Sequence, residues 1–403
     1  MFMLFARQIM PFTLLTVIML QGCSSRPPAP PKPYADARPW GAVDLNISNA
    51  SAEDNTILNS LGTLLKQKAI AYSGRPTHVP INILTLSGGG SRGAYGAGFI
   101  TGWSENGTMP RFDVVTGIST GSIMSTFVFV GGDEIKKVEA FYTALNTEDL
   151  YTKNYFSFFS NVAISDPSPL KQLLAREIDD PLLDKVAAEH AKGRRLYVGT
   201  TNLDTGRLVV WDMGAIASSG RSDRLERYRE VIYASSALPV VFPPQFIALD
   251  INKKRYFQMH VDGGIYTFVF MIGLLDEWSG VLEYAENANS DFDVIVYTIA
   301  NRKYRQRESY DPVNQRPAEV IKALLLTETD LLFDRSMYRL YESVRRKGFK
   351  FRMASIPANA EIAFLPYEFD PVEMKPLFDL GRKEGGGDYK WQESIALDEY
   401  EKQ

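Results

Sequence analysis

Ser119 lies in a stretch that has the residue order of a serine nucleophile. A largely apolar run over residues 112–116 is followed by Gly117, Ser119 and Gly121. This order matches the G-x-S-x-G turn, in which a strand ends, the serine is exposed, and a helix begins. A side chain at either glycine would collide with neighbouring backbone. A chain of this length gives roughly 0.1–0.2 such matches by chance, so the rest of the sequence must supply what a nucleophile needs.

A glycine-rich turn follows the buried strand that we expect over residues 79–86, and two functions compete for it. Gly88, Gly90 and Gly93 match the G-x-G-x-x-G turn of dinucleotide-binding proteins, and Asp113 lies about 20 residues farther on. Alternatively, N–H groups at the helix start form an oxyanion hole. Asp113 lies near the beginning of the next strand, whereas a ribose-binding carboxylate belongs at its end. We therefore favour the oxyanion hole over a nucleotide site or a turn without a ligand.

A serine nucleophile also needs a proton acceptor. In α/β-hydrolases a histidine follows the acid, but nothing around His260 resembles the loop that such enzymes use. A carboxylate can act directly instead. Asp262 ends a strand-like run and is followed by Gly263 and Gly264, so we predict that Asp262 is the general base. We expect His260 to be a core or surface residue rather than a modulator of Asp262.

Together these motifs resemble those of the patatin-like phospholipase family. The matching residues are Gly88, Gly89, Gly90, Ser91, Arg92 and Gly93 in the glycine turn, Gly117, Ser119 and Gly121 in the serine turn, and Asp262, Gly263 and Gly264 in a D-G-G motif. The resemblance implies a Ser119–Asp262 dyad and an oxyanion hole at Gly88, Gly89, Gly90 and Arg92. It also implies a patatin-like three-layer α/β/α fold with a mainly parallel central sheet, a phospholipid or other lipid ester substrate, and neither metal nor cofactor.

Three further segments bear on the resemblance. Residues 234–239 resemble a family segment that lies against the active site. Ser87 stands where the family often has Asp, at what we expect to be the rim of the turn. The Asn and Pro that often follow the D-G-G motif are missing after Gly264, which predicts a more apolar pocket wall beside Asp262. This departure leaves open a catalytically weak or inactive lipid- or partner-binding lipoprotein.

The N-terminus reads as a secretion signal. Arg7 precedes an apolar run that is short for a membrane span, and residues 20–23 resemble the lipobox of bacterial lipoproteins. Cys23, the chain's only cysteine, is therefore the expected site of lipidation after removal of residues 1–22. Ser24 at the next position points, by the same resemblance, to the outer membrane of a bacterial cell envelope. A membrane anchor helix with an incidental cysteine is the alternative.

Composition and periodicity set the domain organisation. The chain has 403 residues and a net charge of −4, which disfavours a nucleic-acid partner. A Pro-rich, extended spacer is expected within a tether over 23–50, and a helix over 52–69 opens the hydrolase domain. Strands alternating with helices predict a mainly parallel sheet covered on both faces. We expect the hydrolase domain over 51–358, with its motif core over 81–270, and a C-terminal helix and tail over 359–403, with a flexible glycine joint at 385–387.

Overall fold

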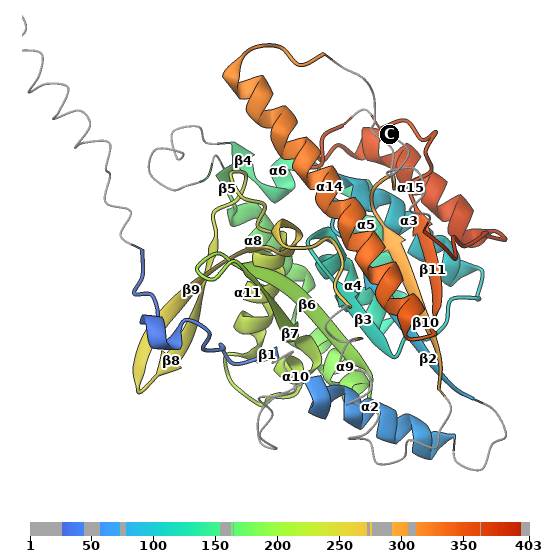
Figure 1. Cartoon of the computed structure of the whole chain (residues 1–403), viewed down its shortest axis with the longest axis horizontal. Helices are drawn as coiled ribbons and strands as arrows, with labels where there is room; N and C mark the ends of the chain where they lie inside the picture. Colours follow the sequence, from blue (N-terminus) through green and yellow to red (C-terminus); the bar gives the residue numbers. More distant parts are fainter. Residues whose placement is uncertain are drawn as a thin grey trace, which may run out of the picture.

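The computed structural model describes residues 26–43, 57–72, 78–153, 163, 165–271, 275, 292–304, 312–362 and 364–395. The expected signal peptide and Cys23 lie outside these residues, so both stay predictions. Figure 1 shows a central sheet with helices on both of its faces. The predicted α/β/α fold class is confirmed.

The large sheet has the strand order β1-β7-β6-β3-β2-β10-β11, and β9 joins it through β6 and β8. Its strands are β1 (Ala42–Val43), β2 (Val79–Leu86), β3 (Val114–Gly117), β6 (Arg195–Asn202), β7 (Arg207–Asp212), β8 (Gln245–Ile251), β9 (Lys254–Asp262), β10 (Phe292–Ala300) and β11 (Lys350–Ser355). The five strands from β6 to β11 in this order are parallel, whereas β1, β7, β8 and β9 pair antiparallel. A small second sheet joins β4 (Thr152–Lys153) to β5 (Ser165–Asp166).

Two apolar cores lie on opposite faces of the sheet because successive strand residues point in opposite directions. In β2, Ile81 and Ile83 belong to the core under α2 (Ile57–Ala71) and α14 (Pro317–Arg346). Leu84 and Leu86 belong to the core on the other face. That face is covered by α3 (Gly93–Glu105), α4 (Thr120–Val130), α5 (Ile135–Ala144), α8 (Ser168–Glu177), α9 (Asp180–Ala191), α10 (Met213–Ser218), α11 (Arg224–Ser236) and α15 (Pro371–Gly386). Shorter pieces are α6 (Thr147–Leu150), η1 (Lys32–Tyr34), η3 (Gly90–Arg92), η4 (Gly132–Glu134) and η6 (Gly263–Ile265).

The Pro-rich segment is docked on the domain, so the prediction of an extended spacer is wrong for its described part. Arg26 binds the Asp204 carboxylate through both terminal nitrogens, one of them at 2.6 Å. Pro28 has no N–H to donate, but its carbonyl accepts from Phe257 N at 2.8 Å along β9. The chain then forms η1 beside the β8–β9 hairpin (Figure 1). The Pro-rich segment has few backbone N–H groups, so it is held by the Arg26 side chain and by the Pro28 carbonyl instead.

The C-terminal glycines make a close helix crossing rather than the predicted flexible joint. They lie at the end of α15, which packs along α3 (Figure 1). A Cβ at Gly381 would lie 2.1 Å from Tyr95 O, and one at Gly385 would lie 2.1 Å from Phe99 O. Because glycine has no side chain, the backbones of α15 and α3 can approach closely. The local sequence does not show that the two helices cross at these residues.

This crossing gives a stability prediction with a matched control. Gly385→Ala should lower the free energy of unfolding by about 1–3 kcal/mol, because the added methyl group forces α15 away from α3. Gly386→Ala should leave it unchanged or raise it slightly, since a Cβ there meets nothing closer than 3.7 Å and alanine favours a helix. Denaturant unfolding of both variants checks this. Equal destabilisation would contradict the close crossing.

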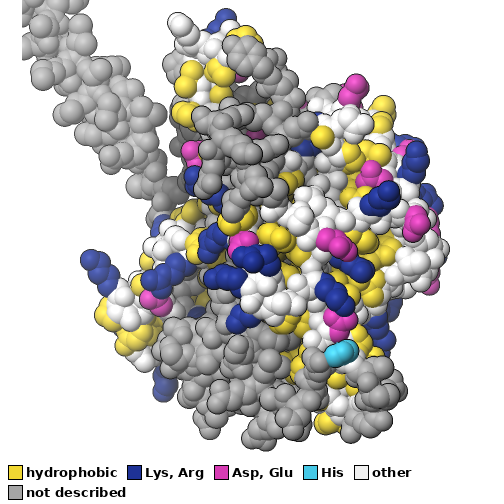
Figure 2. All heavy atoms as spheres, turned by 45° about the vertical axis from the view of Figure 1, so that its right-hand side comes forward, with side chains coloured by type: hydrophobic (Ala, Val, Ile, Leu, Met, Phe, Trp, Pro, Cys, Tyr) yellow, Lys and Arg dark blue, Asp and Glu magenta, His cyan; other side chains and the backbone are white. Residues whose placement is uncertain are grey.

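Surface charge contributes little to this fold. Figure 2 shows one face of the molecule, on which Lys and Arg side chains gather near the middle with Asp and Glu among them. Exposed pairs such as Lys350 with Asp293 (2.8 Å) are worth at most about 1 kcal/mol each. The two apolar cores therefore hold the sheet and its helices together.

Candidate active site

The carboxyl ends of β3 and β9 meet on the same side of β6. β3 runs parallel to β6 and ends with Gly117 opposite Val198. β9 runs antiparallel to β6 and ends with Asp262 opposite Thr200. The two strands therefore approach each other from opposite directions and stop on either side of Gly199. This arrangement brings the turn after β3 next to the turn after β9.

Ser119 occupies the sharp turn between β3 and α4. Its φ of 55° and ψ of −126° lie in a region that L-residues with a side chain rarely adopt. A Cβ at Gly117 would lie 2.4 Å from Gly121 O, and one at Gly121 would lie 2.3 Å from Leu86 O. The collisions expected from the sequence are confirmed, because both glycines touch backbone. The turn leaves the Ser119 side chain partly exposed.

The Ser119 hydroxyl donates a hydrogen bond to Asp262. Ser119 Oγ lies 2.6 Å from Asp262 Oδ2. The other carboxylate oxygen accepts from Gly264 N at 2.7 Å, which fixes the orientation of the group. Burial raises the pKa of Asp262 to about 6, although the bonds from Ser119 and Gly264 lower it. The carboxylate is thus a stronger base than an exposed Asp and can accept the serine proton directly.

His260 is a neutral core residue, as expected from the sequence. It is fully buried, and its Nδ1 lies 2.9 Å from Thr200 Oγ1. Burial lowers its pKa to about 3. Trp211 Nε1 donates to the same threonine oxygen at 2.8 Å, so the imidazole belongs to a closed polar contact inside the fold. Asp262, and not His260, is the side chain that is hydrogen-bonded to the Ser119 hydroxyl.

The glycine turn after β2 contacts Ser119, but the Gly88 N–H is not a free donor. A Cβ at Gly88 would lie 3.2 Å from Ser119 Cβ. The Gly88 N–H donates to Phe268 O at 3.3 Å, which corrects the prediction that this amide belongs to the oxyanion hole. Within the described residues, the N–H groups of Gly89 and Gly90 donate to no acceptor. These two amides remain as candidate oxyanion donors.

Two other residues of the turn lie deeper than the sequence suggests. Ser87 is fully buried instead of at the rim. Its hydroxyl donates to Gly88 O at 2.8 Å and accepts from Asn301 N at 2.8 Å, so it fastens the turn to the end of β10. Arg92 is buried in η3, with 5% of its surface exposed. Its guanidinium is therefore not presented to solvent at the start of α3.

Ser235 holds the backbone of Ser119 in place, a contact that the sequence does not reveal. Its hydroxyl accepts a hydrogen bond from Ser119 N at 3.0 Å and donates one to Gly199 O at 2.7 Å. Ala237 O, two residues on, accepts from Asp262 N at 3.0 Å. The end of α11 and the turn after it therefore hold both partners of the pair. The expected proximity of residues 234–239 to the site was a signal for this role, but it named no single residue.

We predict that Ser235→Ala slows hydrolysis without weakening substrate binding. The variant leaves the buried Ser119 N–H without its acceptor, which costs about 1–3 kcal/mol, so kcat should fall roughly 10- to 100-fold with KM little changed. Ser235→Thr keeps the hydroxyl and should recover most of the rate. Ser236→Ala is the control, because Ser119 O keeps two bonds from Ser122 without it. If Ser236→Ala lowered kcat as much as Ser235→Ala does, Ser235 would have no special role in holding Ser119.

The wall beside Asp262 is apolar, in agreement with the missing Asn and Pro. Phe268, Val269, Phe270 and Met271 are all buried. Phe268 packs edge-on against Phe333 of α14, with 5.6 Å between ring centroids. These four side chains belong to the apolar core under α14, and the Arg302 guanidinium lies 5.3 Å from the Phe268 ring centroid.

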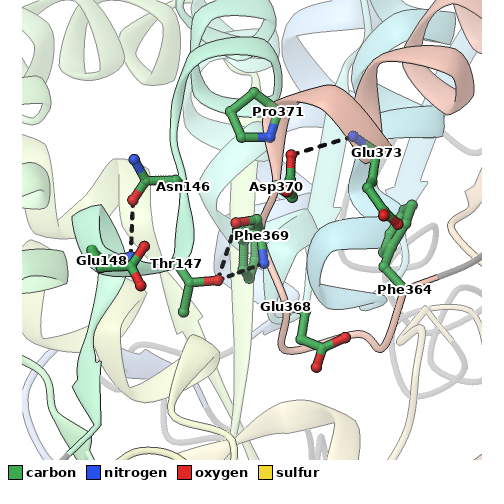
Figure 3. Close-up of a pocket in the computed structure, with 9 residues that line it drawn as sticks. All are labelled: Asn146, Thr147, Glu148, Phe364, Glu368, Phe369, Asp370, Pro371 and Glu373. Atoms are coloured by element: carbon green, nitrogen blue, oxygen red, sulfur yellow. Dashed lines mark hydrogen bonds between the residues drawn. The ribbon is translucent and has the colours of Figure 1, made fainter.

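A separate hollow of about 400 Å³ lies near the start of α15. Figure 3 shows that the Thr147 hydroxyl is hydrogen-bonded to the backbone of Phe369, with 3.0 Å to Phe369 O and 2.9 Å to Phe369 N. It is lined by Asn146, Thr147, Glu148, Phe364, Glu368, Phe369, Asp370, Pro371 and Glu373. The hollow is lined by four carboxylates, and two of them have backbone partners. Asp370 caps α15 by accepting from Val372 N, and Glu368 accepts from Leu365 N. In the described part of the chain no group of His, Cys, Asp and Glu side chains could hold a metal ion.

The comparison with protein families identifies the region of the chain that contains this site. The family model described as patatin-like phospholipase matches residues 84–275, which include the glycine turn, Ser119 and Asp262. Residues 84–275 are a patatin-like phospholipase domain. The resemblance noted in the sequence is confirmed over these residues.

Three solved structures are similar to this chain at low sequence identity. VipD from Legionella pneumophila is 15% identical with a TM-score of 0.37, and the alignment covers 77% of this chain and 66% of VipD. The type III effector ExoU is 12% identical with a TM-score of 0.30, and the alignment covers 76% of this chain and 52% of ExoU. Human GIVD cytosolic phospholipase A2 (12%, TM-score 0.27) is covered over 54%, and this chain over 79%. The chain thus spans about half to two thirds of these proteins. A search of curated proteins gave no match.

Proposed function

We propose that the protein is a membrane-anchored serine lipid acyl hydrolase that cleaves carboxylic esters in the manner of a phospholipase A or lysophospholipase. The observation that carries the proposal is the 2.6 Å contact of Ser119 Oγ with Asp262 Oδ2 inside a patatin-like phospholipase domain. A hydroxyl and a carboxylate in contact are the minimum that nucleophilic ester cleavage requires.

In the first step Ser119 Oγ attacks the ester carbonyl carbon while Asp262 accepts the hydroxyl proton. The carbonyl oxygen becomes an oxyanion, for which we propose the N–H groups of Gly89 and Gly90 as donors. One well-placed donor of this kind is worth about 3–4 kcal/mol. When the tetrahedral intermediate collapses, the alcohol leaves with the proton from Asp262, and the acyl group stays on Ser119.

In the second step water attacks the acyl-enzyme. Asp262 accepts a proton from this water, and the resulting hydroxide adds to the acyl carbonyl at the same oxyanion site. Collapse of the second tetrahedral intermediate releases the fatty acid, and Ser119 recovers its proton from Asp262. Every proton moves between substrate, water and the same two side chains, so the proposed cycle is complete without further groups.

The membrane anchor in this proposal is the lipidated Cys23, and the expected location is the outer membrane. Support comes from the lipobox-like residues 20–23 and from Ser24. Among the described helices, none combines the length and the apolar character needed to cross a bilayer. Metabolic labelling with a radioactive fatty acid checks the proposal. Label should enter the wild-type protein and be absent from Cys23→Ser.

Hydrolysis is tested with purified protein against phospholipids, lysophospholipids and short-chain esters, followed by lipid analysis of treated membranes. Release of free fatty acid, together with labelling of Ser119 by a fluorophosphonate, is the expected result. A folded protein that is inert toward the whole panel would refute the enzyme and favour the lipid- or partner-binding alternative, which the missing Asn and Pro after Gly264 motivate.

A further inference from the structure

We propose that the edge of the sheet at which β2, β3 and β6 end lies on the bilayer that holds the acylated Cys23, so that the enzyme hydrolyses lipids of its own membrane. This inference rests on the proposed function, because it assumes both the lipid anchor and the hydrolase. It adds which side of the molecule faces the lipid and which membrane supplies the substrate. Three independent observations support it.

The first observation is where the docked N-terminal segment begins. Arg26 is fixed to Asp204, which lies in the turn directly after β6. Cys23 precedes Arg26 by three residues, so an extended chain places the two residues at most about 10 Å apart. A lipid on Cys23 therefore cannot lie far from the end of β6.

The second observation is that the glycine turn and the Ser119 turn lie at this same edge. β2, β3 and β6 are parallel neighbours, so their carboxyl ends lie at one edge of the sheet. The glycine turn follows β2 and Ser119 follows β3. From Val198, beside the end of β3, β6 continues for four residues, or roughly 13 Å, to the turn that binds Arg26. The anchor is thus attached on the side from which a lipid would reach Ser119.

The third observation is an exposed apolar rim at this edge. It consists of Leu203 after β6, Val240 after α11, and Ile265 and Tyr266 after Gly264, with exposed fractions of 44%, 52%, 45% and 45%. Exposed apolar side chains are stabilised by contact with the acyl region of a bilayer. The β8–β9 hairpin extends beyond the end of β6 and carries exposed Lys253 and Lys254, whose charge suits anionic head groups.

Labelling of introduced cysteines measures which side faces the lipid, independently of activity. Cys23 is the chain's only cysteine, and acylation consumes its thiol, so an added cysteine is the one free thiol. Leu203→Cys and Tyr266→Cys are made in lipidated Ser119→Ala protein, labelled with an environment-sensitive dye, and placed in vesicles of phosphatidylethanolamine and phosphatidylglycerol. The matched control is Ile70→Cys, which is 70% exposed on α2. The end of α2 lies at the opposite edge, because Lys68 contacts Asp113 and Pro80 where β3 and β2 begin.

Brominated phospholipids in these vesicles should quench the dye at positions 203 and 266 and leave the dye at position 70 unquenched. Equal quenching at the three positions, or stronger quenching at position 70, would overturn the proposed orientation. Since the protein in this experiment is inactive by design, failure of the hydrolase proposal cannot mimic either result.

Activity of the lipidated wild-type protein measures which membrane supplies the substrate. A labelled phospholipid in the same vesicles should be hydrolysed at least about tenfold faster than one in separate vesicles, because the anchor raises the local concentration. Equal rates would overturn the inference, whereas no hydrolysis of any lipid or soluble ester would refute the proposed function instead. Leu203→Asp with Tyr266→Asp should remove most vesicle hydrolysis and keep soluble-ester hydrolysis, and Ile70→Asp should change neither.

Discussion

Ser119→Ala should abolish ester hydrolysis, with kcat/KM falling at least about ten-thousand-fold. The variant removes the attacking oxygen, and Asp262 is left with Gly264 N as its remaining partner in the site. Fluorophosphonate labelling should disappear with the activity. Alanine keeps a Cβ in the same backbone conformation, so circular dichroism and thermal unfolding should be close to those of the wild type. Turnover by the purified variant would refute Ser119 as the nucleophile.

Ser119→Gly separates the chemistry of this position from its backbone strain. Both variants are expected to be inactive. The φ of 55° disfavours any residue with a Cβ. The free energy of unfolding of Ser119→Gly should therefore be about 1–2 kcal/mol higher than that of Ser119→Ala. Chemical denaturation of the two variants measures the difference. A glycine variant less stable than the alanine variant would show that the turn is not strained.

Asp262→Asn should lower kcat/KM about 10³- to 10⁴-fold and leave Ser119 in place. The amide has nearly the shape of the carboxylate, but it cannot accept the serine proton at neutral pH. Esters of good leaving alcohols should lose less activity than phospholipids, because they depend less on protonation of the leaving group. A variant with wild-type activity would show that another group is the base.

The pH dependence of the wild type should report the same carboxylate. Burial raises the pKa of Asp262 to about 6, and the base must be ionised to act. We therefore expect kcat/KM to fall about tenfold per pH unit below about pH 6 and to be level above it. Hydrolysis of a soluble ester across this range checks the prediction. A midpoint near pH 4 would indicate an exposed base.

Stability should change with pH in the opposite sense. The folded pKa of Asp262 is raised from 3.8 to about 6, so the folded state holds this proton more tightly than the unfolded state. The contribution is fully present below about pH 4 and is lost as pH rises through about 6, at roughly 3 kcal/mol. Asp262→Asn lacks this loss, so its unfolding free energy relative to the wild type should increase between about pH 4 and 7. A constant difference would contradict the buried carboxylate.

The sequence by itself determined the local pieces of this protein, because each depends on near neighbours in the chain. The apolar run over residues 79–86 predicted a buried strand, and β2 has these bounds. The glycines around Ser119 predicted a sharp turn, and a collision with backbone explains each of them. Order along the chain also separated the site from a dinucleotide turn, since Asp113 lies just before β3 begins.

Only the tertiary structure decided what depends on contacts between distant residues. The family resemblance predicted that Ser119 pairs with Asp262, but not how the fold brings them together. The contact requires β9 to continue along the side of β6 where β3 ends, and no local pattern encodes that register. No local pattern shows that Ser235 accepts a hydrogen bond from Ser119 N, or that Phe268 O accepts one from Gly88 N. The docking of the Pro-rich segment through Arg26 likewise depends on a distant partner, Asp204. Hydrogen-bond partners and close backbone approaches are properties of three-dimensional packing, so residue types identify the candidates and the fold selects among them.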